Sequence, residues 1–331
     1  MKIRHGKKSP LSLLNRGLAW RGETINGRQN SIQAEATDSV KACPICSGNQ
    51  LHPLAEVYGY KYKFCIECEH VFVSNPPPDE ALKVFYNTLD ANGNMAAPSK
   101  DLLIDDNYDI RVKEICLPKM NFLRDFLPKE NLSWLDVASG VGDLCKAGDM
   151  LGMKMLGIEI DPAEVKFAQK HGANVIHSDF SLPNILQNII KKDVISFISI
   201  LEHVKDPIKF LGNFISNDLR YVVVEVPRAK SISTMVNYQF NSNVARHMCP
   251  PNHLHLFSDQ SLLLMLEKFK IKPIGAWYYG QDAKELFDTM QVSKGGSHPY
   301  FELSDDFLDD LQVLIDRKGL SDEVLMICEV L

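Results

Sequence analysis

Short apolar runs alternate with amphipathic stretches along the chain from Leu132 to its end. Apolar residues in the longer stretches recur at helical spacing, whereas the short runs have the length of β-strands. The runs that we expect to be strands lie near 133–138, 154–159, 173–177, 193–200, 221–226, 271–279 and 324–330. Because strands that alternate with helices are typical of parallel sheets, the pattern predicts an α/β fold with a Rossmann-like, seven-stranded, mostly parallel sheet.

Residues 1–130 follow a different pattern. The first forty residues mix Gly, Ser, Asn, Gln and Arg with little apolar periodicity, which is typical of a flexible segment. Three consecutive prolines at 76–78 separate a cysteine-rich segment from a stretch with apolar residues at helical spacing. The expected organisation is a flexible leader at 1–40, a small knuckle module at 41–75, a helical linker or lid at 76–130, and a main domain at 131–331 with substrate insertions at 227–270 and 280–322.

The knuckle module contains two Cys-x2-Cys pairs that are separated by eighteen residues. This spacing indicates a tetrahedral four-thiolate zinc site, and a unit of about thirty residues needs the roughly 10 to 16 kcal/mol of apparent binding energy that zinc contributes. Free thiols are the alternative. His52 and His70 lie nearby in the sequence, but four cysteines already complete the shell. The expected ligands of a structural Zn²⁺ are Cys43, Cys46, Cys65 and Cys68.

Composition and charge narrow the class of protein. An apolar fraction of 45% and a charged fraction of 24% are ordinary values for a globular protein with a packed core. The net charge of -6 argues against a general nucleic-acid binder. The chain has no apolar run of about eighteen residues and no segment of signal-peptide type, so we expect a cytoplasmic protein without a membrane span.

A glycine loop, Leu135-Asp-Val-Ala-Ser-Gly-Val-Gly142, follows the first strand of the main domain. Glycine lets the backbone turn tightly and approach a ligand, and this end of a parallel strand is where doubly wound sheets bind nucleotides. Glu159 ends the next expected strand, where its carboxylate can accept both hydroxyls of a ribose. A dinucleotide site prefers a third glycine, but that position holds Cys145. The loop therefore favours another adenosine-containing ligand.

The block 132–207 resembles the class I S-adenosylmethionine-dependent methyltransferases. The motifs that carry the resemblance are Leu-Asp-Val-Ala-Ser-Gly-Val-Gly (135–142), Gly-Ile-Glu-Ile-Asp-Pro (157–162), His-Ser-Asp-Phe (177–180) and Asp-Val-Ile-Ser-Phe-Ile-Ser-Ile-Leu-Glu-His-Val (193–204). The resemblance implies S-adenosylmethionine as cofactor, with the glycine loop beside its methionine part, Glu159 on the ribose, Asp179 and Phe180 at the adenine, and Ser199 near the sulfonium. The implied cofactor-binding set is Asp136, Ala138, Ser139, Gly140, Gly142, Glu159, Ile160, Asp179, Phe180 and Ser199.

Ala138 departs from this family pattern, which usually has glycine there. A positive φ costs an alanine on the order of 1 kcal/mol or more. We therefore expect an ordinary, negative φ at Ala138.

The substrate side resembles methyltransferases of sugar and surface-polysaccharide biosynthesis. The resemblance rests on the zinc knuckles, on Val226-Pro227, and on the segment Asn252-His-Leu-His-Leu-Phe-Ser258, and it implies a sugar or nucleotide-sugar as acceptor. His253 matches a histidine of these relatives. The acidic and tyrosine residues that accompany that histidine are missing here, so transfer to oxygen, nitrogen or carbon stays open.

Methyl transfer often needs a base to remove a proton from the acceptor, and histidine suits this role near neutral pH. His253 is the first catalytic candidate, and Glu202 with His203 forms the second. His255 alternates with His253 along an extended run and is expected to point the other way. Gln281 and Asp282, at the end of the sixth strand, are candidates for contact with a polar substrate.

Two other functions compete with methylation of a small molecule. In an RNA methyltransferase the zinc module would grip the nucleic acid, but residues 41–73 contain three lysines and no arginine. In a non-catalytic scaffold the nucleotide pocket would remain without the chemistry. We expect a small-molecule partner of sugar type rather than a nucleic acid, and the oligomeric state stays open.

Overall fold

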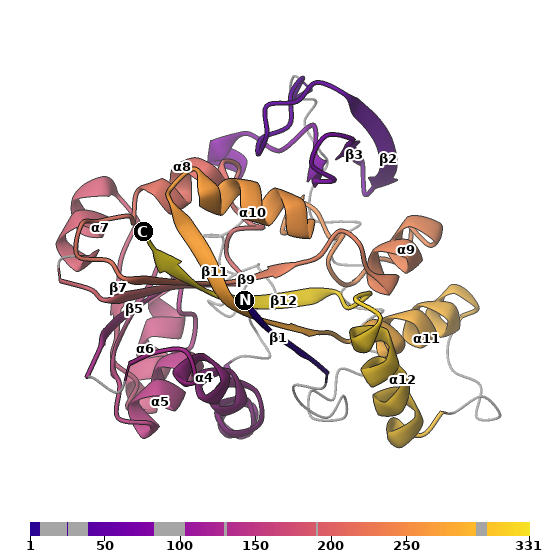
Figure 1. The fold of residues 1–331 in the computed structure, drawn as a ribbon. Helices are drawn as coiled ribbons and strands as arrows, with labels where there is room; N and C mark the ends of the chain where they lie inside the picture. The colour runs from indigo at the N-terminus through magenta and orange to yellow at the C-terminus, as the bar shows by residue number, and fades with distance from the viewer. Residues whose placement is uncertain (7–24, 26–38, 83–102, 129–130, 190, 296–302) are drawn as a thin grey trace.

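The computed structural model describes residues 1–6, 25, 39–82, 103–128, 131–189, 191–295 and 303–331. An eight-stranded sheet forms its centre, with the strand order β1-β11-β12-β9-β8-β5-β6-β7 (Figure 1). The strands are β1 (Lys2–His5), β5 (Ser133–Val137), β6 (Lys154–Glu159), β7 (Val175–His177), β8 (Val194–Ile198), β9 (Tyr221–Pro227), β11 (Ile271–Tyr279) and β12 (Glu323–Val330).

Most neighbouring strands in this sheet are parallel. Strands β9, β8, β5, β6 and β7 all pair in parallel, whereas β12 runs antiparallel to both β9 and β11. All seven expected strands are present, so the prediction of an α/β fold with a mostly parallel, Rossmann-like sheet is confirmed.

The eighth strand, β1, lies within the segment that the sequence led us to expect as a flexible leader. It pairs in parallel with β11, from Lys2 opposite Gly275 to His5 opposite Tyr278. All four of its residues are exposed, so its sequence does not show the alternation of apolar and polar residues that predicts a strand. Contacts with Trp277 hold it instead: the Arg4 guanidinium lies 3.8 Å from the ring centroid, and the indole N–H donates to the Gly6 carbonyl. Residues 7–24 and 26–38 of the same segment lie outside the described part.

Helices cover both faces of the sheet (Figure 1). On one face lie α3 (Asp105–Ile110), the π-helical segment η3 (Arg111–Cys116), α4 (Leu117–Arg124), α5 (Asp143–Met150) and α6 (Pro162–Lys170). On the other lie α7 (Leu182–Ile189), α8 (Pro207–Gly212) and α10 (Asp259–Glu267). A third group, α9 (Ile232–Gln239), α11 (Asp282–Ser293) and α12 (Asp305–Arg317), packs together around a small apolar cluster of its own.

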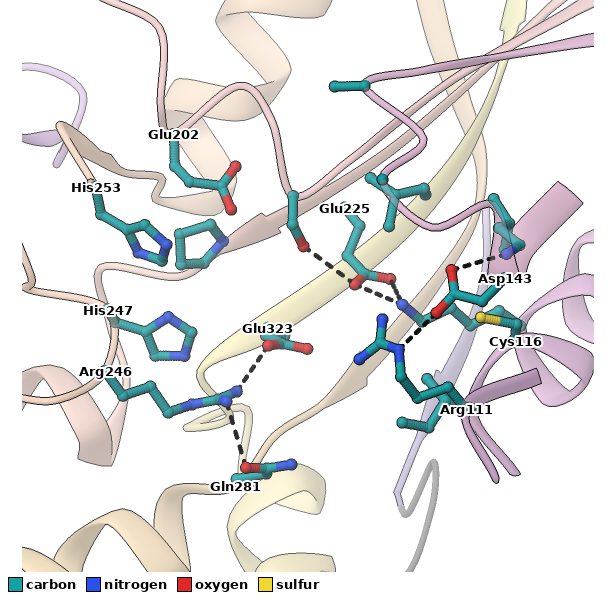
Figure 2. A pocket seen from close by; sticks show the side chains of 18 of the residues that line it. Arg111, Cys116, Asp143, Glu202, Glu225, Arg246, His247, His253, Gln281 and Glu323 are labelled. Carbon is teal, nitrogen blue, oxygen red and sulfur yellow. Dashed lines mark hydrogen bonds and ion pairs between the residues drawn. The ribbon is translucent and has the colours of Figure 1, made fainter. Parts of the chain in front are cut away.

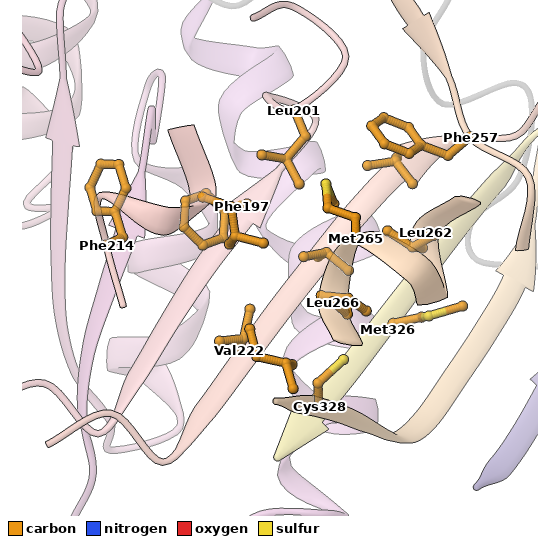
Figure 3. Packing of buried hydrophobic residues seen from close by; sticks show 14 of the residues in the cluster. Phe197, Leu201, Phe214, Val222, Phe257, Leu262, Met265, Leu266, Met326 and Cys328 are labelled. Carbon is orange, nitrogen blue, oxygen red and sulfur yellow. The ribbon is translucent and has the colours of Figure 1, made fainter. Parts of the chain in front are cut away.

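The alternation of strand residues between the two faces explains the apolar runs. In β9, Val222 and Val224 pack on the α8 and α10 side, whereas Val223 packs on the opposite side. Figure 3 shows Val222 with Met326 and Cys328 of β12 beneath the side chains of α10. Because both faces of these strands are buried, their sequences read as continuous apolar runs.

A second, four-stranded sheet forms the knuckle module, with the order β10-β4-β3-β2. Its strands are β2 (Leu51–Val57), β3 (Tyr60–Cys65), β4 (Val71–Val73) and β10 (His255–Leu256). Strand β10 comes from the main domain and pairs with β4, His255 opposite Phe72. The knuckle module is therefore joined by backbone pairing to the segment that contains His253. Among the described residues no helix is long and apolar enough to cross a membrane.

Candidate functional site

A cavity of about 380 Å³ lies at the carboxyl ends of β5, β8, β9 and β11. The chain leaves β5 toward β6 on one side, and β8 returns on the other side of β5. Such a reversal of strand order opens a crevice outside the carboxyl ends of the strands, which is where open α/β sheets bind ligands. The glycine loop forms one wall of this cavity, η3 and α4 form a second, and the loop 245–253 forms the opposite wall (Figure 2).

The glycine loop turns sharply between β5 and α5. Gly140 and Gly142 have φ angles of 54° and 70°, in the left-handed region that favours glycine. A Cβ atom on Gly142 would also lie 2.7 Å from Cγ2 of Val175, so even the smallest side chain would clash. Residues 138–141 and Asp143 of this turn line the cavity, whereas Gly142 packs against the protein interior.

The expectation of a negative φ at Ala138 is wrong, because its φ is 55°. The turn that takes the chain from β5 into the loop requires this conformation. It is stabilised by the hydrogen bond from the Ser139 N–H to the Ile158 carbonyl and by the one from the Gly142 N–H to the Ser139 carbonyl. Ala138 therefore adopts a left-handed conformation that has a steric cost for alanine and none for glycine.

Asp136, at the end of β5, is buried and lines the cavity. The Ser196 hydroxyl donates to its carboxylate over 2.5 Å. Burial raises the pKa of Asp136 to about 7, because a charged carboxylate loses its hydration there. A ligand with a positive charge beside Asp136 would compensate for that loss.

Glu159, Asp179 and Phe180 lie at the ends of β6 and β7 and do not line the cavity. The Glu159 carboxylate accepts the N–H groups of Gly140, Ile160 and Asp161 at 2.9, 2.7 and 3.0 Å, while burial raises its pKa. It therefore ties the glycine loop to the end of β6. Asp179 is exposed and accepts from the Ser181 N–H, which lowers its pKa.

Two ion pairs on the cavity wall, one partly buried and one buried, were not anticipated from the sequence. Arg111 in η3 contacts Asp143 over 2.6 Å, and Lys119 in α4 contacts Glu225 of β9 over 2.6 Å. The Glu225 carboxylate also accepts the Tyr279 hydroxyl. Arg111, Ile115 and Lys119 all line the cavity at intervals of four residues, which places them on one helical face. That spacing is the signal that sequence reasoning missed in the segment expected to be a linker or lid.

Ser199 follows β8 and lines the cavity between the glycine loop and Glu225. Its φ is 51°, and its hydroxyl donates to the Glu225 carboxylate over 3.4 Å. The polar groups at the end of β8 are thereby coupled to the buried Lys119 pair.

The structure brings the three expected catalytic residues together across fifty residues of sequence. Glu202 and His203 follow β8, and the Leu254 N–H donates to the Glu202 carbonyl, which holds the His253 segment beside them. The nearest carboxylate oxygen of Glu202 lies 3.8 Å from Nε2 of His203, and the His203 and His253 rings lie 4.7 Å apart. Glu202 is only 1% exposed, and burial raises its pKa well above the ordinary value.

His255 points away from this cluster, as expected. Its ring binds the His70 imidazole at 3.0 Å and the Val204 carbonyl at 3.0 Å. His255 is therefore a buried structural residue that joins the knuckle module to the main domain.

A further polar group on the loop wall was also missed. Arg246 donates to Glu323 over 2.7 Å and to Gln281 over 3.3 Å, and all three residues line the cavity (Figure 2). His247 lies beside them with its Nε2 atom 3.0 Å from the Asp322 carboxylate. No local sequence pattern marks these residues, because they come from a loop, the end of β11 and the start of β12. Gln281 was expected at a pocket, whereas Asp282 is buried behind it and accepts backbone N–H groups.

Residues 108–271 match the family model described as "Methyltransferase domain". This match spans the glycine loop, the Lys119 and Glu225 pair and the Glu202 cluster. The chain is an S-adenosylmethionine-dependent methyltransferase.

Several solved structures are similar to the methyltransferase. One is a SAM-dependent methyltransferase from Archaeoglobus fulgidus, at 16% identity over 67% of this chain and 97% of that chain, with a TM-score of 0.41. Another is a possible histamine N-methyltransferase from Thermotoga maritima, at 16% identity over 64% of this chain and 88% of that chain, with a TM-score of 0.42. A third is magnesium protoporphyrin IX methyltransferase from Synechocystis PCC 6803 with bound SAH, at 12% identity over 76% and 99%, with a TM-score of 0.43. No curated protein matches the chain.

The residues at the cavity fit S-adenosylmethionine. Its methionine part carries an ammonium, a carboxylate and a sulfonium, so it needs both signs of charge nearby. The buried Asp136 and the Arg111 guanidinium both line the cavity beside the glycine loop. Gly140 lines the cavity without a side chain, whereas Gly142 lets the loop pack closely against Ala168, Ala173 and Val175.

The four cysteines of the methyltransferase's knuckle module lie together. The Cys43 and Cys68 sulfurs are 3.5 Å apart, as are those of Cys46 and Cys65, and all four sulfurs lie within 4.8 Å of one another. Sulfurs that surround zinc tetrahedrally at about 2.3 Å are separated by about 3.8 Å. The thiol set therefore fits a four-coordinate zinc ion. His70 is bound to His255 and Ser261 instead, and His52 is exposed.

Proposed function

We propose that this methyltransferase transfers a methyl group from S-adenosylmethionine to a small polar acceptor, a sugar or nucleotide-sugar. One observation carries the proposal. A single cavity has the glycine loop on one wall and Glu202 with His253 on the opposite wall (Figure 2), and the ring of His203 lies next to these two residues. This arrangement lets a nucleophile approach from the side opposite the cofactor, which in-line transfer requires.

The cofactor occupies the carboxyl ends of β5, β6 and β7 in this proposal. Asp136 would accept the ammonium, Arg111 would bind the carboxylate, and Ser199 would be on the sulfonium side. Glu159 would accept the ribose hydroxyls with the Ile160 backbone beside it, and Asp179 with Phe180 would hold the adenine. When bound, S-adenosylmethionine supplies an electrophilic methyl carbon.

The acceptor half of the cavity activates the nucleophile. Glu202, His203 and His253 are the activating groups, and His253 is the principal one. The bond between the acceptor atom and its proton breaks, the proton is taken up on this side of the cavity, and the acceptor atom bonds to the methyl carbon as the carbon–sulfur bond breaks. Neutral thioether and methylated acceptor result, so the charges balance.

The size and polarity of the cavity support a small acceptor. Its volume of about 380 Å³ is within the range of about 300 to 1,000 Å³ that is typical of small-molecule sites. Arg246, Gln281 and Glu323 offer both donors and acceptors along the loop wall, and such groups suit vicinal hydroxyls.

The knuckle module binds a structural Zn²⁺ in this proposal. Four thiolates complete a tetrahedral shell and leave no position for catalysis. The metal would hold β3 and β4 in place, and β4 pairs with β10 next to His253.

A direct assay tests this function. The purified protein is incubated with labelled S-adenosylmethionine and a panel of nucleotide-sugars, glycans and RNA, and the label is located by mass. We expect label on a sugar-type acceptor, and label on RNA alone would refute the choice of acceptor. His253→Ala should abolish turnover and retain cofactor binding, whereas a non-catalytic scaffold would show no transfer to any acceptor and no effect of this substitution.

A further inference from the structure

We infer that Glu202, His203 and His253 form a binding site for a divalent cation of the Mn²⁺, Fe²⁺ or Zn²⁺ type. This site rests on the proposed function, because the cation would bind and acidify a hydroxyl of the acceptor. It is separate from the four-cysteine site. The donor atoms of the three residues all lie within 4.8 Å of one another, and Glu202 and His253 line the acceptor half of the cavity (Figure 2).

A hydrogen bond fixes which ring nitrogen of His203 carries the proton. Its Nδ1 atom lies 2.7 Å from the Asn252 carbonyl, which can only accept a hydrogen bond. The single proton of the neutral imidazole is therefore on Nδ1, and Nε2 carries a lone pair. That lone pair faces a carboxylate oxygen of Glu202 at 3.8 Å. Two electron-rich atoms face each other stably only with a proton or a cation between them, and a backbone carbonyl behind the distal nitrogen is typical of metal-bound histidine.

The carboxyl group of Glu202 is buried. It is 1% exposed, and its Oε2 atom has no hydrogen-bond partner among the described residues. A buried, unsatisfied carboxyl group is costly, and the cost falls when a metal ion binds it. The Glu202 side chain is therefore incomplete without a ligand.

Carboxylates outnumber cationic side chains around the cavity. Its lining contains five carboxylates, Asp136, Asp143, Glu202, Glu225 and Glu323, and three cationic side chains, Arg111, Lys119 and Arg246. The cations pair with Asp143, Glu225 and Glu323. Asp136 and Glu202 are the two carboxylates of this lining that pair with none of these three cations. Asp136 faces the cofactor side, so Glu202 is the carboxylate that remains for a second positive charge.

The donor set indicates the kind of cation. Two imidazoles and one carboxylate with an open side suit Mn²⁺, Fe²⁺ or Zn²⁺ better than Mg²⁺ or Ca²⁺, which prefer oxygen ligands. A cation there would hold the acceptor hydroxyl and lower its pKa. The released proton would pass to His247, whose ring lies 5.9 Å from that of His253 and whose Nε2 faces Asp322. The resulting alkoxide oxygen bonds to the methyl carbon as the carbon–sulfur bond breaks.

Metal binding tests the site without reference to turnover. Full-length protein is dialysed against a chelator, zinc retained by the four cysteines is counted by mass spectrometry, and Mn²⁺ is titrated with detection by electron paramagnetic resonance. We expect one exchangeable Mn²⁺ per chain in addition to the retained zinc. Glu202→Gln and His253→Ala should each weaken Mn²⁺ binding at least tenfold and leave the zinc count unchanged. His177→Ala and Glu267→Gln, at exposed positions, are the matched controls and should bind Mn²⁺ like the wild type.

The outcomes separate this site from the proposed function. Cofactor affinity and the melting temperature of each variant verify that it is folded. Absence of a second metal in the wild type, or equal Mn²⁺ affinity in Glu202→Gln and the controls, overturns the cation site. Full transfer activity after removal of the exchangeable metal also overturns it, and the methyltransferase function then stands. Specific Mn²⁺ binding without transfer to any sugar-type acceptor supports the site and refutes the proposed acceptor instead.

Discussion

Lys119→Met is expected to destabilise the protein strongly, because it removes the cation from a buried ion pair. The Lys119 and Glu225 side chains are 6% and 3% exposed, and their charged atoms lie 2.6 Å apart. After the substitution Glu225 keeps the hydroxyls of Tyr279 and Ser199 as donors, but it loses the cation that lies 2.6 Å from its carboxylate. A buried charge without its partner costs about 3 to 5 kcal/mol.

Equilibrium unfolding in urea measures this cost. The double variant Lys119→Met with Glu225→Gln should recover most of the lost stability, since a neutral amide needs no cation. Its oxygen can accept from one of the two hydroxyls, and its NH2 group can donate to the oxygen of the other. The exposed pair of Lys170 and Asp105, whose charged atoms lie 2.8 Å apart, provides the control. Lys170→Met should change the free energy of unfolding far less, because water screens that pair.

Two results would refute this reasoning. A loss of less than about 1 kcal/mol for Lys119→Met would show that the buried charge is already solvated or neutral. A double variant as unstable as the single variant would show that the cost comes from packing and not from the unpaired carboxylate.

Three further predictions concern the cofactor side and the knuckle module. The pKa of Asp136 is raised to about 7, and its carboxyl group must lose its proton before it can bind a cationic ligand. Cofactor affinity, measured by calorimetry, should therefore rise about tenfold from pH 6 to pH 8. An equal rise in Asp136→Asn would contradict this prediction. Ala138→Gly should raise the free energy of unfolding by up to about 1 kcal/mol, because it relieves the positive φ; a loss of stability would show that the entropy of glycine outweighs the strain. Cys46→Ser should abolish zinc retention, measured by mass spectrometry, and full retention would mean that the four sulfurs are not the ligands.

The strands of the main sheet were predictable because each has a local cause. Val222, Val223 and Val224 are apolar since both faces of β9 are buried, and this makes a continuous run in the sequence. The glycine loop and the cysteine pairs are equally local, since a tight turn and a metal knuckle each need particular residue types within a few positions. Strand β1 was not predicted because it has no such local cause. Its residues are exposed, and its strand conformation depends on its pairing with β11.

The sequence by itself determined the α/β class, the position of the cofactor loop and the cysteine cluster, because those depend on neighbours along the chain. It did not determine the φ of Ala138, which the path from β5 into the loop imposes. Only the tertiary structure placed Glu202 and His203 beside His253, paired Lys119 with Glu225, and brought His247 to Asp322. Each of these contacts joins segments that fold onto different strand ends, and no periodicity in a single segment encodes which strand ends meet.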